Sequence, residues 1–310
     1  MGSIPQPAWR TPPAAGAGRR REAFAPYLFI TPAILLLLIF NIYPLLNGIV
    51  LSLRDWDGVN PRPAFVGLDN YLRIASDEVF WTSLRNALGF GLVGLIGGGG
   101  LGLAMALAVN TNPRGATIFR AIFFLPWILS VVVVGFLFVW LLDPAVGPFN
   151  RMLTSLGLGQ WAYAWFAEPA TAFPALAVVY IWAHWGIGFL LFLAGLQNIP
   201  IDVIEAATID GAGAWQRFRD IVWPLLVPIT VVVSVITLLL ALQIFGTILV
   251  TTNGGPGYHT EVPTLRIYKE SFQFFRFGMA AAMSVVFGIV LVIVSLGQLW
   301  LSKRYGQDQQ

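Results

Sequence analysis

The sequence predicts an all-α integral membrane protein with six transmembrane helices and a short polar loop between the fourth and the fifth. Of its 310 residues, 57% are hydrophobic and 11% are charged, whereas soluble domains carry about 25% charged residues. Six segments stay apolar over about 20 residues, the length that crosses a bilayer. The polar loop, residues 200–224, lies between two long stretches without Asp, Glu, Lys or Arg, and it must therefore lie on one aqueous face of the membrane.

The predicted spans divide the chain into a membrane domain, residues 26–303, with a tail at each end. They cover residues 27–51, 86–109, 119–142, 172–196, 225–250 and 277–301. Residues 1–25 are rich in Pro, Ala, Gly and Arg, so we expect a disordered tail there, and 304–310 form a second short tail. The cluster Arg19-Arg20-Arg21 beside the first span favours a cytoplasmic N-terminus, and six spans then return the C-terminus to the cytoplasm.

Composition excludes several kinds of function. The chain has no cysteine and two histidines, so disulfides, thiolate metal sites and cysteine nucleophiles are excluded, and a histidine-rich metal site is not expected. The sequence contains no Gly-x-x-x-x-Gly-Lys-Ser/Thr phosphate loop and no Gly-x-Ser-x-Gly nucleophile elbow. The net charge of +3 is small and does not argue for nucleic acid. Because the interiors of the predicted spans carry no ionisable side chain except His184, an ion-coupled transport cycle has no obvious acidic or basic group to use.

The polar loop has the pattern of two short helices separated by a turn. Pro200 suits a first helical position, and Asp202 lies in the first turn, where the helix dipole favours negative charge. Gly211 can adopt the left-handed conformation that ends a helix. Residues 214–221 then predict a second short helix before the next span.

The loop also carries a spaced motif: Glu205-Ala206-Ala207, three residues, Gly211, nine residues, Ile221, one residue, then Trp223-Pro224. This resembles the EAA loop of ABC importer permeases, although the family usually has Leu where this chain has Trp223. The resemblance implies the type I importer permease fold, in which the loop, residues 198–224, holds a coupling helix that seats in a cleft of a cytoplasmic ATPase. The coupling residues it implies are Glu205, Ala206, Ala207, Asp210, Gly211, Ala212, Phe218, Ile221 and Pro224. The alternative is an ordinary amphipathic connector.

Three further segments are similar to carbohydrate-importer permeases: Phe65-Val66-Gly67-Leu68-Asp69-Asn70-Tyr71, Phe119 to Trp127, and Thr251-Thr252-Asn253-Gly254-Gly255-Pro256. The resemblance covers roughly residues 25–302. It implies a multi-pass subunit of the cytoplasmic membrane that is not itself an enzyme, has no cofactor, and imports a sugar or a polyol by alternating access. The implied partners are a second permease, two copies of an ATPase that binds ATP and Mg²⁺, an extracytoplasmic binding protein, the sugar and membrane lipid. An ion-coupled secondary transporter for a small polar solute is the alternative.

Resemblance to maltose-type permeases also implies a substrate pathway along the fourth and fifth spans. The facing positions are Ala183, His184, Ile187, Thr237, Leu240, Ala241 and Ile244, with Gln243 beside them. Aromatic rings and neutral hydrogen-bonding groups suit a sugar, which offers apolar C–H patches and hydroxyls. Several of these positions are apolar where the maltose-type pocket is polar, so a smaller pocket or a transit path is expected. The alternative is that His184 and Gln243 only bridge neighbouring helices.

Glycine, proline and aromatic residues predict three further structural features. The glycine-dense second span, with Gly97 to Gly100 and Gly102, predicts close packing of helices. Pro126 predicts a kink in the third span. The aromatic residues of the outer loop 143–171, namely Trp161, Trp165 and Phe166, predict either an interfacial belt or a contact with an extracytoplasmic partner.

Overall fold

In the computed structural model, which describes residues 18–111 and 114–307, five helices are long and apolar enough to cross a membrane. A bent pair of helices makes a sixth span when it is counted as one. The predicted all-α architecture with six spans is therefore confirmed. The strands of the described chain form one two-residue antiparallel ladder, in which Arg54 pairs with Phe65 and Asp55 with Ala64.

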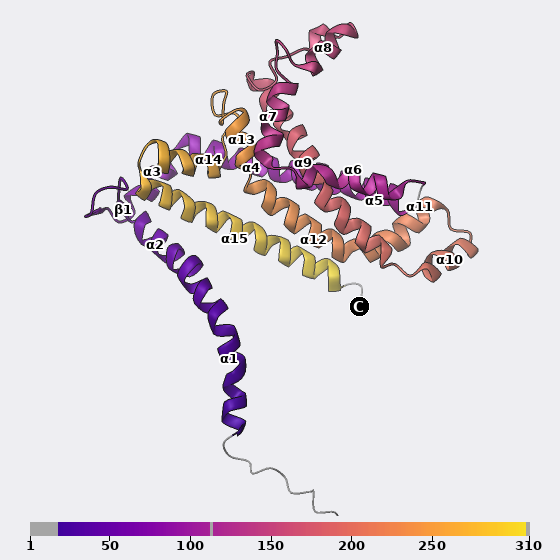
Figure 1. Ribbon diagram of the computed structural model, residues 1–310, viewed down its shortest axis with the longest axis horizontal. Coiled ribbons are helices and arrows are strands. Elements are labelled where there is room, and N and C mark those ends of the chain that lie inside the picture. The colour runs from indigo at the N-terminus through magenta and orange to yellow at the C-terminus, as the bar shows by residue number, and fades with distance from the viewer. Residues whose placement is uncertain (1–17, 112–113, 308–310) are drawn as a thin grey trace, which may run out of the picture.

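The first span contacts the rest of the molecule through its second half. It consists of α1 (Gly18–Leu37), a π-helical turn η1 (Leu38–Ile42) and α2 (Tyr43–Ser52). In Figure 1, α2 approaches α15 and α1 leads away from the other helices. Because α1 begins at Gly18, residues 18–25 of the predicted tail are helical, and residues 1–17 lie outside the described chain.

The motif at residues 65–71 connects the loop after the first span to the end of that span. This loop contains β1 (Arg54–Asp55), β2 (Ala64–Phe65) and α3 (Asp69–Ala75). The buried Asn70 amide donates hydrogen bonds to the carbonyl oxygens of Ser52 and Arg54, at 2.9 and 3.0 Å. The Tyr71 hydroxyl lies 2.6 Å from Ser52 Oγ. These bonds satisfy backbone groups where the helix ends.

The second span packs closely on the fourth through glycines, as predicted. It consists of α4 (Glu78–Val93), a π-helical turn η2 (Gly94–Gly99) and α5 (Gly100–Asn110), and the fourth span is α9 (Pro169–Gln197). A Cβ atom added to Gly102 would lie 2.7 Å from the backbone nitrogen of Phe189, and one added to Gly188 would lie 2.9 Å from the Gly98 carbonyl oxygen. A side chain at either position would push the two backbones apart.

The third span is broken, and its break is not at the predicted position. It consists of α6 (Ala116–Ile128) and α7 (Val131–Leu141), which meet at 97°. Pro126 lies inside α6, and the chain becomes extended at Leu129 and Ser130, so the expectation of a kink at Pro126 itself is corrected. Proline clashes with the residue before it in the helical conformation, yet here the helix continues through it for two more residues.

The loop after α7 has a small core of its own. It contains α8 (Pro148–Ser155) and the 3₁₀ turn η3 (Gly159–Trp161). The Trp165 indole donates a hydrogen bond of 2.7 Å to Asn150 Oδ1, and the Asn150 amide donates to the Tyr163 carbonyl oxygen. Trp165 and Phe166 are therefore partly buried within the protein, whereas Trp161 is exposed.

The fifth span is also broken, which the sequence analysis did not predict. The helices α10 (Ile201–Ile209) and α11 (Ala214–Arg217) and the π-helical turn η4 (Phe218–Val222) lead into α12 (Trp223–Leu242). Regular helix stops at Gln243 and resumes as α13 (Gly246–Thr251). After the loop that follows α13 come α14 (Pro263–Tyr268), the π-helical turn η5 (Lys269–Gln273) and α15 (Phe277–Gln307). Residues 304–307 of the predicted second tail are helical, and 308–310 lie outside the described chain.

Buried charges join the N-terminal end of the second span to the segment that precedes the sixth. Arg266 Nη2 lies 2.9 Å from Glu270 Oε1 and 3.3 Å from Asp77 Oδ2. Arg276 Nε lies 3.0 Å from Glu270 Oε2, and the Glu270 side chain is 1% exposed. Asp77 also caps α4 by accepting hydrogen bonds from the backbone N–H groups of Val79 and Phe80.

A second buried pair holds the loop between the fifth and sixth spans. Lys269 Nζ lies 2.8 Å from Glu261 Oε2, and it donates a 2.9 Å hydrogen bond to the Asn253 carbonyl oxygen. The Asn86 amide of α4 donates to the Glu261 carbonyl oxygen at 2.9 Å. The glycine-rich turn after α13 is thereby fixed to two other elements.

The elements separate into two ends along the long axis of the molecule. Figure 1 shows α10, α11, the C-terminal end of α5 and the C-terminal end of α15 at one end, and β1, α3 and α14 towards the other. Between them, α4, α9 and α12 surround the core, whose fully buried side chains include Phe90, Leu176, Tyr180, Ala241 and Leu242.

Candidate functional site

The polar loop at one end of the molecule is a helix–turn–helix whose turn depends on Gly211. The backbone N–H of Ala212 donates a hydrogen bond to the Ala207 carbonyl oxygen at 2.9 Å. The backbone N–H of Gly211 donates to the Thr208 carbonyl oxygen at 3.1 Å. This pair of bonds is a Schellman motif, which requires a left-handed residue after the helix. Gly211 has φ +81°, as the sequence analysis expected.

Side chains join the two short helices. Arg217 Nη1 of α11 donates a 2.7 Å hydrogen bond to Thr208 Oγ1 of α10. Thr208 Oγ1 in turn donates to the Ile204 carbonyl oxygen at 2.8 Å. The turn and these two bonds give the loop one defined shape, which a binding partner can recognise without ordering it first.

The loop presents large apolar side chains to solvent at its tip. Ile209 is 86% exposed and Trp215 is 70% exposed. Single exposed apolar residues are normal, but here two of them, Ile209 and Trp215, are exposed on the same short polar loop. Neither residue was among the predicted coupling residues, although a tryptophan and an isoleucine in an otherwise polar loop are a sequence signal for a contact surface.

The predicted coupling residues fall on two sides of the loop. Glu205, Ala206, Asp210 and Gly211 are exposed. The others turn at least partly towards the protein, namely Ala207, Ala212, Phe218, Ile221 and Pro224. The first group is accessible from solvent, and the second group is at least partly covered by the protein.

A second candidate site lies where the two broken spans meet. The break between α6 and α7 and the break between α12 and α13 are neighbours, because a Cβ atom added to Gly246 would lie 3.0 Å from Val131 Cγ2. Gly135 of α7 likewise faces Val250 and Thr251 of α13. The halves α7 and α13 therefore pack as a pair, and each is connected to the bundle by a short non-helical segment.

His184 of α9 lies beside the first of these breaks. Its ring stacks on Tyr180, with ring centroids 4.0 Å apart, and meets Trp127 of α6 edge-on at 5.7 Å. His184 Nδ1 lies 2.9 Å from the Tyr180 carbonyl oxygen of its own helix. Trp185 Nε1 donates to the Phe123 carbonyl oxygen at 3.1 Å and fastens α9 to α6.

The structure does not present all of the predicted pathway residues to one space. Ala183, Thr237, Ala241 and Ile244 are buried between helices, and the Thr237 hydroxyl donates to the Val233 carbonyl oxygen. Those accessible at least in part are His184, Ile187, Leu240 and Gln243. Gln243 marks the break after α12, so the sequence analysis named this position without predicting the break.

Neither site has the side chains of a metal centre. No group of three His, Cys, Asp or Glu residues that could hold a metal ion occurs among residues that the structure describes. The region around the breaks offers aromatic rings and neutral hydrogen-bonding groups, which can bind an uncharged polar molecule.

A family model and several curated proteins match this chain. The model for binding-protein-dependent transport system inner membrane components matches residues 98–307. A probable ABC transporter permease protein of Pyrococcus horikoshii is 36% identical, with 92% of this chain and 98% of that protein covered. The trehalose/maltose transport system permease protein MalF of Thermococcus litoralis is 34% identical, with 93% and 96% covered.

A third relative and two solved structures are also similar to this chain. The sn-glycerol-3-phosphate transport system permease protein UgpA of Agrobacterium fabrum is 32% identical, with 90% of this chain and 95% of that protein covered. A bacterial ABC transporter involved in the import of the acidic polysaccharide alginate has a chain of similar structure, with a TM-score of 0.81 and 26% identity over 93% of this chain and 98% of that one. The same TM-score, with 25% identity over 93% and 96% of the two chains, relates this chain to a bacterial alginate ABC transporter in complex with an alginate pentasaccharide-bound periplasmic protein.

Proposed function

Because this chain belongs to the binding-protein-dependent transport system inner membrane components and is an ABC importer permease, we propose that it carries a sugar or a related polyol into the cell. Relatives at 32% to 34% identity are named for trehalose/maltose and for sn-glycerol-3-phosphate. The aromatic and neutral polar side chains near the helix breaks suit such a solute. The chain acts as a membrane subunit, and ATP is hydrolysed by a separate protein.

The exposed tip of the polar loop is the observation that carries the coupling proposal. Ile209 and Trp215 are large, apolar and exposed on a loop whose shape is fixed by hydrogen bonds. Apolar and aromatic anchors of this kind dominate protein–protein binding energies. We assign the loop, including Glu205 and Gly211, to the cleft of an ABC ATPase, two copies of which serve a pair of permeases.

This assignment sets the orientation in the membrane. The coupling loop, both termini and the turn between α5 and α6 lie in the cytoplasm, and β1, α8 and the loop after α13 face outward. An extracytoplasmic binding protein delivers the substrate on the outer side.

Alternating access then follows from the paired breaks. Closure of the ATPase dimer moves the polar loop, and the continuous helix from Ala214 to Leu242 passes this motion to the break at Gln243. Because α7 and α13 pack on each other, they move as one piece about their two breaks. His184, Leu240 and Gln243 lie at or near these breaks, and they form the transit path in the proposal.

An ion-coupled secondary transporter is the alternative function. Such a protein needs an ionisable group that binds the ion inside its spans. The spans α9 and α12 hold no Asp, Glu, Lys or Arg, and family membership also favours the importer. Uptake that stops on loss of the ATPase and persists with an uncoupler supports the importer, and the opposite pattern supports the alternative.

The coupling proposal is tested by Ile209→Asp in the complete transporter. An anchor of this kind contributes at least about 2 kcal/mol, so co-purification of the ATPase should fall about 30-fold or more. The same substitution at Val59, which is 82% exposed on the outer hairpin, is the matched control and should leave the ATPase bound. Undiminished ATPase on Ile209→Asp would contradict the proposal.

A further inference from the structure

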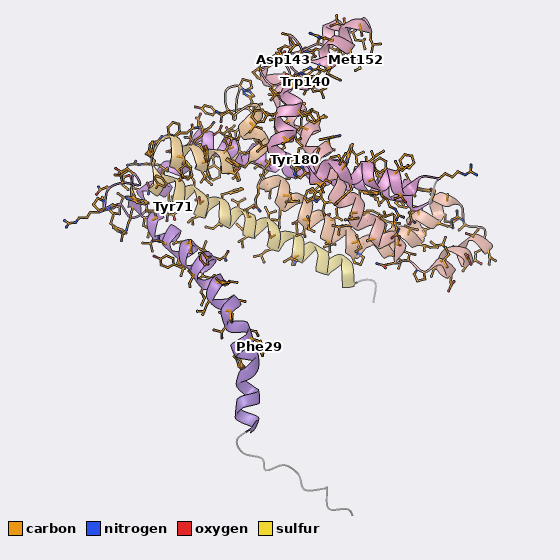
Figure 2. The ribbon with its side chains drawn as sticks, in the orientation of Figure 1. Phe29, Tyr71, Trp140, Asp143, Met152 and Tyr180 are labelled. Atoms are coloured by element: carbon orange, nitrogen blue, oxygen red, sulfur yellow. The ribbon has the colours of Figure 1, made fainter. Side chains whose placement is uncertain are left out.

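A groove between α6 and α9 is separate from both candidate sites. It has a volume of about 360 Å³, and its lining includes Arg120, Phe124, Leu190, Leu193, Ala194 and Gln197. Figure 2 labels Tyr180 where α9 passes α7, and the groove lies further along α9, towards α10. Neither the polar loop nor the two helix breaks contribute a residue to this lining.

The polar side chains of the groove lie at one end of it. Arg120 is near the start of α6, and Gln197 is the last residue of α9, so the two helices bring them to the same end of the bundle. The walls beyond this end are formed by apolar side chains, including Phe124, Leu190 and Leu193. The groove therefore has a polar mouth and an apolar interior, which is the pattern of an amphiphilic ligand.

No carboxylate of these helices neutralises Arg120. Neither α6 nor α9 contains Asp or Glu. The Arg120 side chain is exposed and forms no ion pair or hydrogen bond with residues 18–111 or 114–307. Arg114, which is also exposed, adds a second positive charge just before α6. Because a guanidinium binds a phosphate through parallel N–H bonds, the mouth of the groove suits an anionic group.

We propose that this groove binds an anionic phospholipid, with the phosphate on Arg120 and Gln197 and an acyl chain along the apolar walls. Basic pockets between membrane helices on the cytoplasmic side bind lipid headgroups of this kind. A sugar fits less well, because its hydroxyls point in all directions and the groove offers hydrogen bonds at one end only. Lipid binding goes beyond the transport function and takes from it only the orientation, which supplies the lipid from the cytoplasmic leaflet.

The test titrates the purified complete transporter with phosphatidylglycerol in detergent and counts the bound lipid by native mass spectrometry. Loss of a hydrogen-bonded charge should weaken binding about tenfold or more, so Arg120→Gln should lower the lipid count accordingly. Arg114→Gln is the matched control, because it removes the same charge nearby from a residue that does not line the groove. An equal count for Arg120→Gln and the wild type would overturn the inference and assign Arg120 to interfacial water.

A second variant fills the groove without changing its charge. Ala194→Trp should displace the lipid, whereas Val178→Trp, at an exposed position of the same helix outside the groove, should not. Phosphatidylcholine should bind more weakly than phosphatidylglycerol, and equal affinity would contradict an anionic site. Inorganic phosphate alone should not displace the lipid, and displacement would contradict binding of an acyl chain. Lipid is counted whether or not the ATPase is bound, so a failure of the coupling proposal is seen separately.

Discussion

His184 combines an aromatic surface with a hydrogen-bonding group beside a helix break. One face of its ring is covered by Tyr180, and its edge contacts Trp127. A neutral polar solute that passes this position can bond the ring nitrogen that Tyr180 does not occupy. A substitution of His184 therefore distinguishes the pathway hypothesis from the alternative that His184 only bridges neighbouring helices.

We expect His184→Leu to lower uptake about fivefold, because one hydrogen bond to a solute contributes about 1 kcal/mol. Tyr180→Phe is the control, since the buried Tyr180 hydroxyl has no partner within the described chain and its loss keeps the stacked ring. Uptake of radiolabelled substrate by cells with equal amounts of permease measures both. Unchanged kinetics for His184→Leu would favour a merely bridging histidine.

Glu270 makes the outer charge cluster sensitive to pH. Burial raises the pKa of its carboxyl above the ordinary value, and this outweighs Arg266 and Arg276, which lower it. When the pKa of a carboxyl is higher in the folded than in the unfolded state, the free energy of unfolding falls as the pH rises through the folded-state pKa. The wild type should therefore gain thermal stability relative to Glu270→Gln as the pH falls towards the ordinary glutamate range, and a difference that is independent of pH would contradict this.

Sequence reasoning at single positions succeeded where a local rule applies. Gly211 was predicted because only a left-handed residue ends α10 in this way, and φ +81° agrees. The partnership of Asp77 with Arg266 was beyond such reasoning, since the two are 189 positions apart. Ile209 and Trp215 were not predicted as contact residues, because neither belongs to the spaced motif from which the coupling residues were taken.

Among the elements, the contact between the second and fourth spans is sensitive to a single methyl group. A Cβ atom at Gly102 would lie 2.7 Å from a backbone nitrogen of α9, and one at Gly100, two residues earlier, would meet open space. We expect Gly102→Ala to cost about 1–3 kcal/mol by overpacking. Gly100→Ala should be neutral or stabilise by up to about 1 kcal/mol.

Thermal unfolding of the purified protein in detergent compares these two variants. They change the same helix by the same group, so helix propensity contributes equally to both. Equal melting temperatures would show that the close contact between α5 and α9 does not limit stability.

The lengths and types of the spans could be predicted from apolar composition, and their interruptions could not. The break after Leu242 carries no proline, and Gln243 and Gly246, which lie at its two ends, do not by themselves end a membrane helix. The break at Leu129 follows Pro126 by three residues, and the proline indicated a disturbance without fixing its place. The helices that follow the two breaks, α7 and α13, pack on each other, and this contact is a property of the tertiary structure.

At the scale of the whole molecule, every functional assignment depends on which end faces the cytoplasm. The polar loop lies at one end in Figure 1, and the outer loop with α8 extends from a different part of the molecule. The chain contains no cysteine, so a single introduced cysteine is the only thiol of this chain that a labelling reagent can modify. Gln216 on α11 and Ser155 on α8 are both exposed, and either can be replaced with little effect on folding.

We expect Ser155→Cys to react with a membrane-impermeant maleimide in intact cells, because α8 faces outward in the proposed orientation. Gln216→Cys should react only after the membrane is made permeable, since the coupling loop must reach an ATPase that is supplied with cytoplasmic ATP. The reverse pattern would place the loop outside, and no ATPase could then drive transport through it. Reaction of both residues in intact cells would show a mixed topology, in which the basic N-terminal cluster does not set the orientation.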